Sequence, residues 1–302
     1  MIFEKCMTNK FFEATKVDDS IFRITGMGRE NCYLVEGNER ALLIDGLSGV
    51  GSLKAFVREL TELPVIMAAT HGHLDHIGAA WEYDELFLHP DDIALMYAER
   101  HSRREARLNF VNIFVSFGLK LRTAPTLADT LMAHAVKTYP IYEGDRFDLG
   151  GREIEVIAVP GHTYGTVVFL DRERRTLFSG DACNANTLLN LEESASVEEY
   201  QESLKHLKLF QKDFDVMYGG HDMTAIPNSI MDDGIALCER ILAGRDDAVP
   251  MEDPFGGSSY LAAERGEDYS PKCGGICNIV YKKDRLHRRA HPSITGVPNC
   301  YR

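Results

Sequence analysis

The sequence predicts an α+β fold, because two regions with the pattern of short strands flank one region with the pattern of helices. The first strand-rich region covers roughly the first ninety residues, and the second begins near Arg152. Residues from about 91 to 137 lie between them and lack strand alternation. Since no linker-like segment interrupts the chain, we expect residues 1–302 to form a single domain with a helical insertion at about 91–137.

Composition and charge narrow the class of protein. The chain has 302 residues, 44% of them hydrophobic and 26% charged, with a net charge of -13. The charge argues against a nucleic-acid partner, and no segment resembles a secretory signal or a membrane span. Seven scattered cysteines are typical of reduced thiols. We therefore expect a cytoplasmic protein that acts on a small molecule, and the oligomeric state is left open.

In the first region, short apolar segments bounded by turn residues indicate strands. These segments are Ile21–Gly26, Cys32–Glu36 and Ala41–Asp45. Gly37-Asn38 favours a hairpin between the last two. Helical spacing follows over Val50–Leu60, and Val65–Ala69 indicates a buried strand that ends just before a run of histidines.

The second region repeats the strand pattern and adds two helices. Predicted strands are Arg152–Val159, Thr166–Leu170, Thr176–Phe178, Val216–Tyr218 and Ile276–Tyr281. Apolar residues recur with helical spacing over Val197–Phe210 and Ile230–Leu242. The Gly-, Ser- and charge-rich segment Gly256–Cys273 is predicted to be a loop.

Four side chains that can bind metals lie within six residues after the strand Val65–Ala69. They are His71, His73, Asp75 and His76. Imidazole nitrogen and carboxylate oxygen together suit zinc, iron or manganese. In a tight loop these side chains can point to two sides, so one motif can serve two neighbouring metals.

Three further candidates occupy the same position relative to a strand. His162 follows a strand through Pro-Gly, Asp181 follows one through Ser-Gly, and His221 follows one through Gly-Gly. Loops at one edge of a rigid sheet commonly hold reactive groups. Each residue alone is weak evidence, but together with the first motif they predict a two-metal site.

These motifs resemble those of the metallo-β-lactamase-fold superfamily, in particular its glyoxalase II-like branch. The resemblance covers about residues 21 to 221 and implies a four-layer αββα sandwich with the metals at one edge. It also implies that His71, His73 and His162 bind one metal and that Asp75, His76 and His221 bind the other. Asp181 would then bridge both metals.

A hydrolase that uses two divalent metal ions is the expected function. Two metals about 3.5–4 Å apart can activate a bridging hydroxide as the nucleophile, and Asp75 is a candidate catalytic residue that orients it. Zinc is the expected metal, with iron or manganese as alternatives. We expect a small-molecule thioester, lactone or other ester as substrate. A mononuclear iron dioxygenase acting on persulfides, a phosphodiesterase of the same fold and a non-catalytic binding module remain alternatives.

Residues around these motifs have weaker signals. Asp45, at a strand end, is expected to support the metal ligands from behind. Cys183 is expected in the core or lining the pocket, and Thr70 and Thr163 are expected to be structural. The phenylalanines Phe110, Phe114 and Phe117 share a helix face that we expect to point into the core. Six histidines are assigned no site role: His89, expected to be structural, and His101, His134, His206, His287 and His291, expected on solvated faces.

Overall fold

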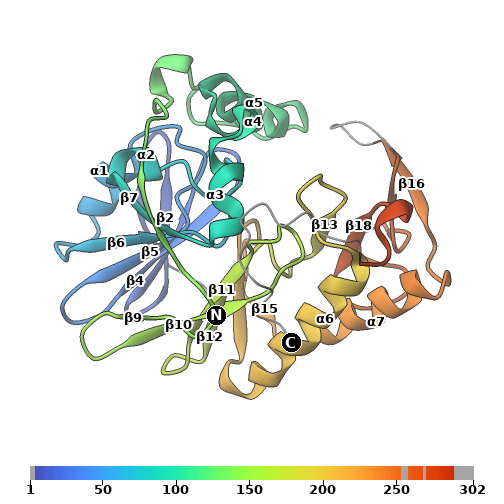
Figure 1. The fold of residues 1–302 in the computed structure, drawn as a ribbon. Helices are drawn as coiled ribbons and strands as arrows, with labels where there is room; N and C mark the ends of the chain where they lie inside the picture. Colours follow the sequence, from blue (N-terminus) through green and yellow to red (C-terminus); the bar gives the residue numbers. More distant parts are fainter. Residues whose placement is uncertain (1–3, 253–257, 268–269, 289–302) are drawn as a thin grey trace.

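The protein is described here by a computed structural model that covers residues 4–252, 258–267 and 270–288. Its largest sheet has eight strands in the order β1 to β8. The middle strands β4 to β7 can be followed in Figure 1. The strands are β1 Glu4–Thr8, β2 Glu13–Asp18, β3 Ile21–Thr25, β4 Asn31–Glu36, β5 Ala41–Ile44, β6 Val65–Ala68, β7 Glu85–Leu88 and β8 Lys137–Pro140. Pairing is antiparallel from β1 to β5 and parallel from β5 to β8.

A second sheet has six strands in the order β15-β14-β12-β11-β10-β9. Its strands are β9 Arg146–Asp148, β10 Glu153–Ala158, β11 Val167–Asp171, β12 Thr176–Gly180, β14 Val216–Gly219 and β15 Ile226–Pro227. The strands predicted between Arg152 and Tyr218 are thus present, with ends within two residues of those expected. One pair, β12 and β14, is parallel, which brings the ends of these two strands to the same edge.

The two sheets pack face to face, and alternation along the strands explains why. On β4, Leu34 packs into the core cluster of the outer face, while its neighbours Tyr33 and Val35 pack into the cluster between the sheets. That inner cluster also contains Val156 and Phe178 from the second sheet. Successive side chains of a strand point to opposite faces, so an apolar strand of this kind must be covered on both sides.

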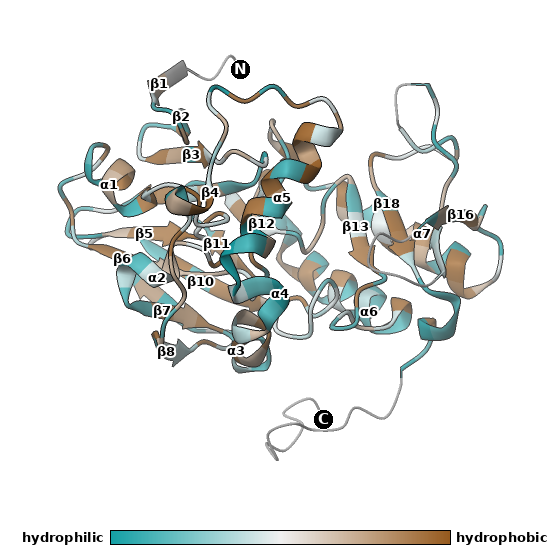
Figure 2. Ribbon diagram, turned by 90° about the horizontal axis from the view of Figure 1, so that it is seen from above, coloured by the Kyte–Doolittle hydropathy of each residue, from teal (hydrophilic) through white to brown (hydrophobic). Residues whose placement is uncertain are grey.

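Helices provide the two outer layers. Helices α1 (Leu53–Arg58) and α2 (Ala80–Tyr83) pack on the outer face of the eight-stranded sheet, and α6 (Val197–Leu207) and α7 (Ile230–Leu242) pack on that of the six-stranded sheet. The predicted αββα sandwich is therefore confirmed. Figure 2 shows largely brown strands in the two sheets, whereas the exposed turns of α6 are teal.

A third, four-stranded sheet was not predicted. Its order is β13-β18-β17-β16, and its strands are β13 Asn186–Leu189, β16 Val249–Glu252, β17 Ser258–Leu261 and β18 Asn278–Tyr281. The prediction of a loop over Gly256–Cys273 is wrong where β17 lies. The four residues of β17 are half polar, so the local pattern carried no strand signal, although β17 pairs antiparallel with the strand just before it, β16, as well as with β18.

The helical segment after β7 comprises α3 (Pro90–Tyr97), α4 (Glu99–Ser102) and α5 (Arg104–Ser116). From Phe117 to the start of β8 the only regular element is one 3₁₀ turn, so the helices fill only the first part of the expected insertion. The expectation that its phenylalanines face the core is wrong for Phe117, whereas Phe110 is partly buried and packs against the core of the eight-stranded sheet. Phe117 is 83% exposed, and Phe110 and Phe114 are half-buried. No helix in the described part of the chain is long and apolar enough to cross a membrane.

Candidate metal centre

The seven residues singled out from the sequence meet at one edge of the sandwich. Each follows a strand: the first four follow β6, and His162, Asp181 and His221 follow or end β10, β12 and β14. They form three groups of potential metal-binding atoms, each with all atoms within 4.8 Å of one another. The groups are His71, His73 and His162; His71, His76 and Asp181; and Asp75, His76 and His221.

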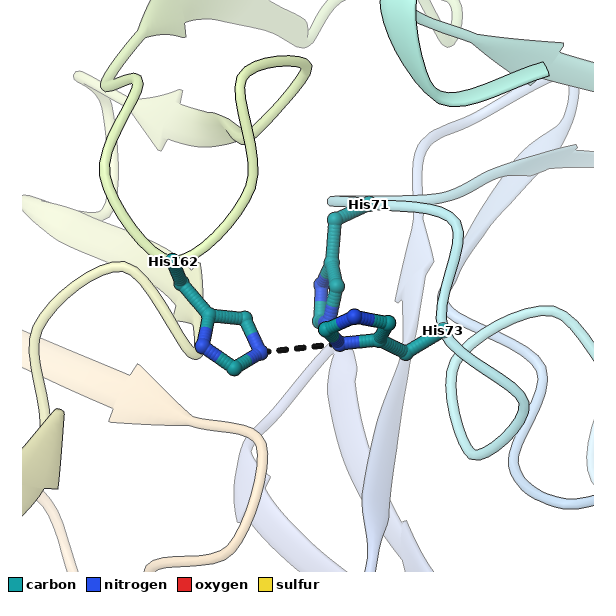
Figure 3. Close-up of side chains that lie close together, drawn as sticks. All are labelled: His71, His73 and His162. Atoms are coloured by element: carbon teal, nitrogen blue, oxygen red, sulfur yellow. Dashed lines mark hydrogen bonds between the residues drawn. The ribbon is translucent and has the colours of Figure 1, made fainter. Parts of the chain in front are cut away.

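In the first group, three imidazole nitrogens converge on one point. His73 Nδ1 lies 3.0 Å from His71 Nε2 and 2.9 Å from His162 Nε2. Figure 3 shows that His162 approaches from its own loop, opposite the loop that carries the other two. Three converging imidazole nitrogens match the protein part of a catalytic zinc site.

The group of Asp75, His76 and His221 combines carboxylate and imidazole. His221 Nε2 lies 3.2 Å from Asp75 Oδ2 and 3.4 Å from Asp181 Oδ2. The same oxygen of Asp181 lies 3.7 Å from the Nε2 atoms of His76 and His162. Asp181 therefore lies between the three-histidine group and the group that contains His221, where a bridging ligand would have to be.

The chemistry of these donors fits a pair of divalent cations. Burial and the neighbouring imidazoles hold the pKa of His71 well below its usual range, and burial with His73 lowers the pKa of His162 to about 4, so both rings are neutral, as metal binding by imidazole requires. At the other end, burial opposes charge on His76, yet Asp45, Asp75 and Asp181 raise its pKa. Positive charge is thus favoured there. Moreover, His76 Nε2 is buried without a hydrogen-bond partner among the described residues.

Asp45 supports the cluster from behind, as the sequence predicted. It accepts hydrogen bonds from His76 Nδ1 at 2.9 Å and from the backbone N–H of Thr70 at 2.7 Å. The Thr70 hydroxyl also donates to Asp45 and lies 3.0 Å from His71 Nδ1. Asp45 adopts a left-handed backbone with φ of 68°, a conformation that aspartate tolerates better than most residues and that is enriched at functional sites.

Asp92, near the start of α3, is a supporting residue that the sequence analysis missed. Its buried carboxylate accepts hydrogen bonds from the backbone of Gly72 at 2.8 Å and of Gly165 at 3.0 Å. It also accepts from the hydroxyl of Thr163 at 2.7 Å, which gives Thr163 the structural role expected for it. One side chain thereby ties together two of the loops that carry metal-site histidines. The only feature of the sequence that could have drawn attention to Asp92 was its place in the first turn of a helix.

His101 and Glu193 were also missed. His101 was expected on a solvated face, which is wrong: it is buried and stacks on His73, with ring centroids 5.0 Å apart. Glu193 accepts a hydrogen bond of 2.6 Å from His73 Nε2 and pairs at 2.9 Å with Arg100 of α4. Glu193 lies in the loop after β13, so no local pattern could place it beside His73.

The remaining candidates lie away from the metal-site atoms. Cys183 is buried in the core between the second sheet and its helices. His89 caps α3, as its expected structural role implies. His134, His206 and His287 pair with surface carboxylates, and His291 lies outside the described residues. Phe110, by contrast, comes within 6.5 Å of His221, measured between ring centroids, so the helical segment does reach the site.

Comparison with known proteins identifies the class. A family profile described as the Metallo-beta-lactamase superfamily matches residues 25–221, which include every residue of the candidate metal centre. The chain belongs to the metallo-β-lactamase superfamily and is a hydrolase of that fold.

Among individual proteins, the chain is similar to two thioester hydrolases. It is 29% identical over 272 residues to the human acyl-coenzyme A thioesterase MBLAC2, covering 83% of this chain and 82% of the relative. It is 25% identical over 157 residues to the hydroxyacylglutathione hydrolase GloC of Haemophilus influenzae, covering 51% and 66% of the two chains. Both relatives fall within the function class expected from the motifs.

Solved structures confirm the fold. The DIM-1 metallo-beta-lactamase superposes with a TM-score of 0.56 at 16% identity, covering 78% of this chain and 100% of the other. The sec-alkylsulfatase Pisa1 from Pseudomonas sp. superposes with a TM-score of 0.56 at 17% identity, covering 77% and 42%. At this identity the likeness extends to the architecture only.

Proposed function

We propose that this protein hydrolyses small-molecule thioesters, with acyl-coenzyme A thioesters as the first candidates, at a site that holds two divalent metal ions. The observation that carries the proposal is the convergence of the imidazole and carboxylate groups at one edge of the sandwich. The two named relatives are both thioester hydrolases, which favours thioesters over the lactones and other esters that the motifs also allow.

In this proposal, His71, His73 and His162 hold the first ion, Asp75, His76 and His221 hold the second, and Asp181 contacts both. Zinc suits this donor set. Two such ions supply a water of lowered pKa and polarise the thioester carbonyl. Asp75, whose pKa is lowered by His76 and His221 against the effect of burial, is ionised at neutral pH and would accept a hydrogen bond from the attacking water.

Cys183, the cysteine nearest to the metal-site motifs in sequence, does not offer a competing nucleophile at this site. Cys183, two residues beyond Asp181, is 1% exposed, and burial raises the pKa of its thiol to about 12. A thiol that is neutral at pH 7 and closed to solvent is a poor nucleophile. Attack by water is therefore the route that the described residues support.

The test is a hydrolysis assay on the purified full chain loaded with zinc. The panel contains an acyl-coenzyme A, an acylglutathione, a lactone and a phosphodiester, and we expect the thioesters to react fastest. His71→Ala should lower kcat/KM by on the order of 100-fold or more, since even residues behind metal ligands matter by 10- to 100-fold. His134→Ala, at an exposed histidine, serves as control. Full activity of His71→Ala, or turnover of the phosphodiester alone, would overturn the proposal.

A further inference from the structure

We infer that a small cationic pocket beside the metal centre binds a phosphate group of the thioester substrate. The pocket has a volume of about 150 Å³ and carries the side chains of Lys10, Arg29, Lys120 and Arg122, with Met223 at one wall. The inference rests on the proposed function and adds to it the site that recognises the phosphorylated end of a coenzyme A-type thiol.

The charge of this pocket contrasts with that of the chain. The protein as a whole has a net charge of -13, yet the pocket wall contains four cationic side chains and a single carboxylate, that of Glu13. In an acidic protein, such a patch attracts anions locally while the rest of the surface repels them. A patch of this sign beside a reaction centre therefore indicates an anionic substrate.

Two of the four cations have no carboxylate partner among the residues that the structure describes. Lys10 pairs with Asp129 at 3.4 Å and Arg122 pairs with Glu13 at 3.2 Å. Arg29 and Lys120 make no ion pair within the described ranges, and the Arg29 guanidinium contacts the Met223 sulfur at 3.9 Å. These two are free to bind an incoming anion, and an arginine fork next to a lysine suits phosphate oxygens.

The pocket adjoins the metal centre through two loops. Met223 lies two residues beyond His221, and Arg29 lies in the loop between β3 and β4. These loops are joined, because Asn31 donates from its backbone to the Gly220 carbonyl at 2.6 Å and from its side chain to the Asp222 carbonyl at 3.0 Å. A ligand in the pocket therefore contacts the same loop that carries a metal-site histidine.

A larger pocket elsewhere does not share these properties. It measures about 440 Å³ and lies at the start of β10, whereas the metal-site histidine follows the end of that strand. Its cations are neutralised: Arg146 pairs with Glu153 at 3.0 Å, and Arg172 pairs with Glu155 at 2.9 Å. Position and charge balance thus separate the two pockets.

Size and charge favour a phosphate over a glutathione carboxylate. The cationic pocket, of about 150 Å³, has room for one phosphate group together with a few waters. A phosphate ester carries a charge of about −1.5 to −2 at pH 7. Glutathione has carboxylates but also an ammonium group, which these cations would repel.

The first test measures binding without catalysis. Adenosine 3′,5′-bisphosphate, which carries phosphates but no thiol, is titrated calorimetrically into the full chain. We expect the double variant Arg29→Gln/Lys120→Gln to weaken binding at least tenfold, while Arg146→Gln in the larger pocket leaves it unchanged. Lys120→Gln alone should show a smaller loss of bisphosphate affinity. Because Lys120 is exposed, this single variant is a control in case the double variant misfolds.

The second test is kinetic. With an acyl-coenzyme A, the double variant should raise KM about tenfold with little change in kcat, because the lost contact is made equally before and during reaction. With the matching acylpantetheine, which lacks phosphate, KM should be the same in both proteins. Unchanged bisphosphate binding in the double variant would overturn the pocket assignment. If no thioester reacts at all, the proposed function fails, and the bisphosphate titration still decides the pocket.

Discussion

At the scale of residues, the candidate metal centre is defined as much by its supporting contacts as by its potential ligands. Four imidazoles each point one nitrogen into the cluster, and the other ring nitrogen has a polar neighbour. The neighbours are Thr70 for His71, Glu193 for His73, Asp45 for His76 and the Leu188 carbonyl for His162. Such partners fix the tautomer and direction of a ligating ring. The rings are therefore oriented for metal binding by the protein itself.

Glu193 provides the sharpest test of this arrangement. Replacing it with glutamine removes the charge that accepts the hydrogen bond of His73, so we expect affinity for the first metal ion to fall about 10- to 100-fold. Competition with a chelator of known zinc affinity measures this directly. Glu192→Gln is the matched control, because Glu192 is exposed and contacts Arg100 but not His73. Equal zinc affinity in the two variants would show that Glu193 does not orient His73.

The buried position of His101 leads us to expect that the free energy of unfolding depends on pH. Burial, with the neighbouring His73, lowers its pKa from 6.5 to about 3. Below pH 6.5 the unfolded chain therefore takes up a proton that the folded chain does not, and stability falls as the pH drops. Between pH 7 and 5 this difference costs about 2 kcal/mol. In the metal-free proteins, the free energy of unfolding should fall less between pH 7 and 5 for His101→Gln than for the wild type, as measured by urea denaturation. An identical loss in both proteins would contradict the assignment.

At the scale of elements, the site depends on loops at strand ends that are tied together by a helix. The sequence could locate these loops, because an apolar strand followed by small residues and a histidine or aspartate is a local pattern. It could not show that Asp92 of α3 holds two of them, since that contact joins Gly72 to Gly165 across the sandwich. The same holds for His101, whose buried position depends on where α4 packs.

Asp92→Ala tests whether the hydrogen bonds of this carboxylate hold the two loops together. The substitution leaves three buried or partly buried donors without their acceptor, and an unsatisfied donor costs about 1–3 kcal/mol. We expect a loss of about 3 kcal/mol or more in unfolding free energy, together with weaker metal binding. Asp91→Ala, at the neighbouring exposed position, should cost less than about 1 kcal/mol, since it removes a charge only from the first helical turn. If both variants lost a similar amount of unfolding free energy, Asp92 would not hold the two loops together as proposed.

At the scale of the whole molecule, the sequence predicted the two-sheet sandwich but not the third sheet. Strands such as β4 are apolar on both faces, and motifs resembling a known family gave the arrangement of layers. The third sheet was missed because β17 is half polar and β16 contains Pro250, so neither segment has the local pattern of a strand. Since β13 leads into the loop that carries Glu193, missing the sheet also meant missing that residue.

Metal binding should stabilise the whole fold, because the clustered loops come from both sheets. Removing the metal leaves carboxylates and imidazoles crowded in a buried space, and a ligand that binds only the folded state adds RT ln(1 + [L]/Kd). At 100-fold excess over Kd this is about 2.7 kcal/mol. We expect a chelator to lower Tm by several degrees and added zinc to restore it, as followed by calorimetry. A Tm indifferent to zinc would contradict a metal site built from both sheets.

The central claim is that the converging residues hold two metal ions in one site. Elemental analysis of the purified full chain, reconstituted with zinc and freed of excess metal, tests it most directly. The account predicts about two equivalents per chain for the wild-type protein and a clear loss for Asp181→Ala, whose carboxylate stands between the two groups. A single iron per chain with oxygen uptake, or no retained metal, would contradict it.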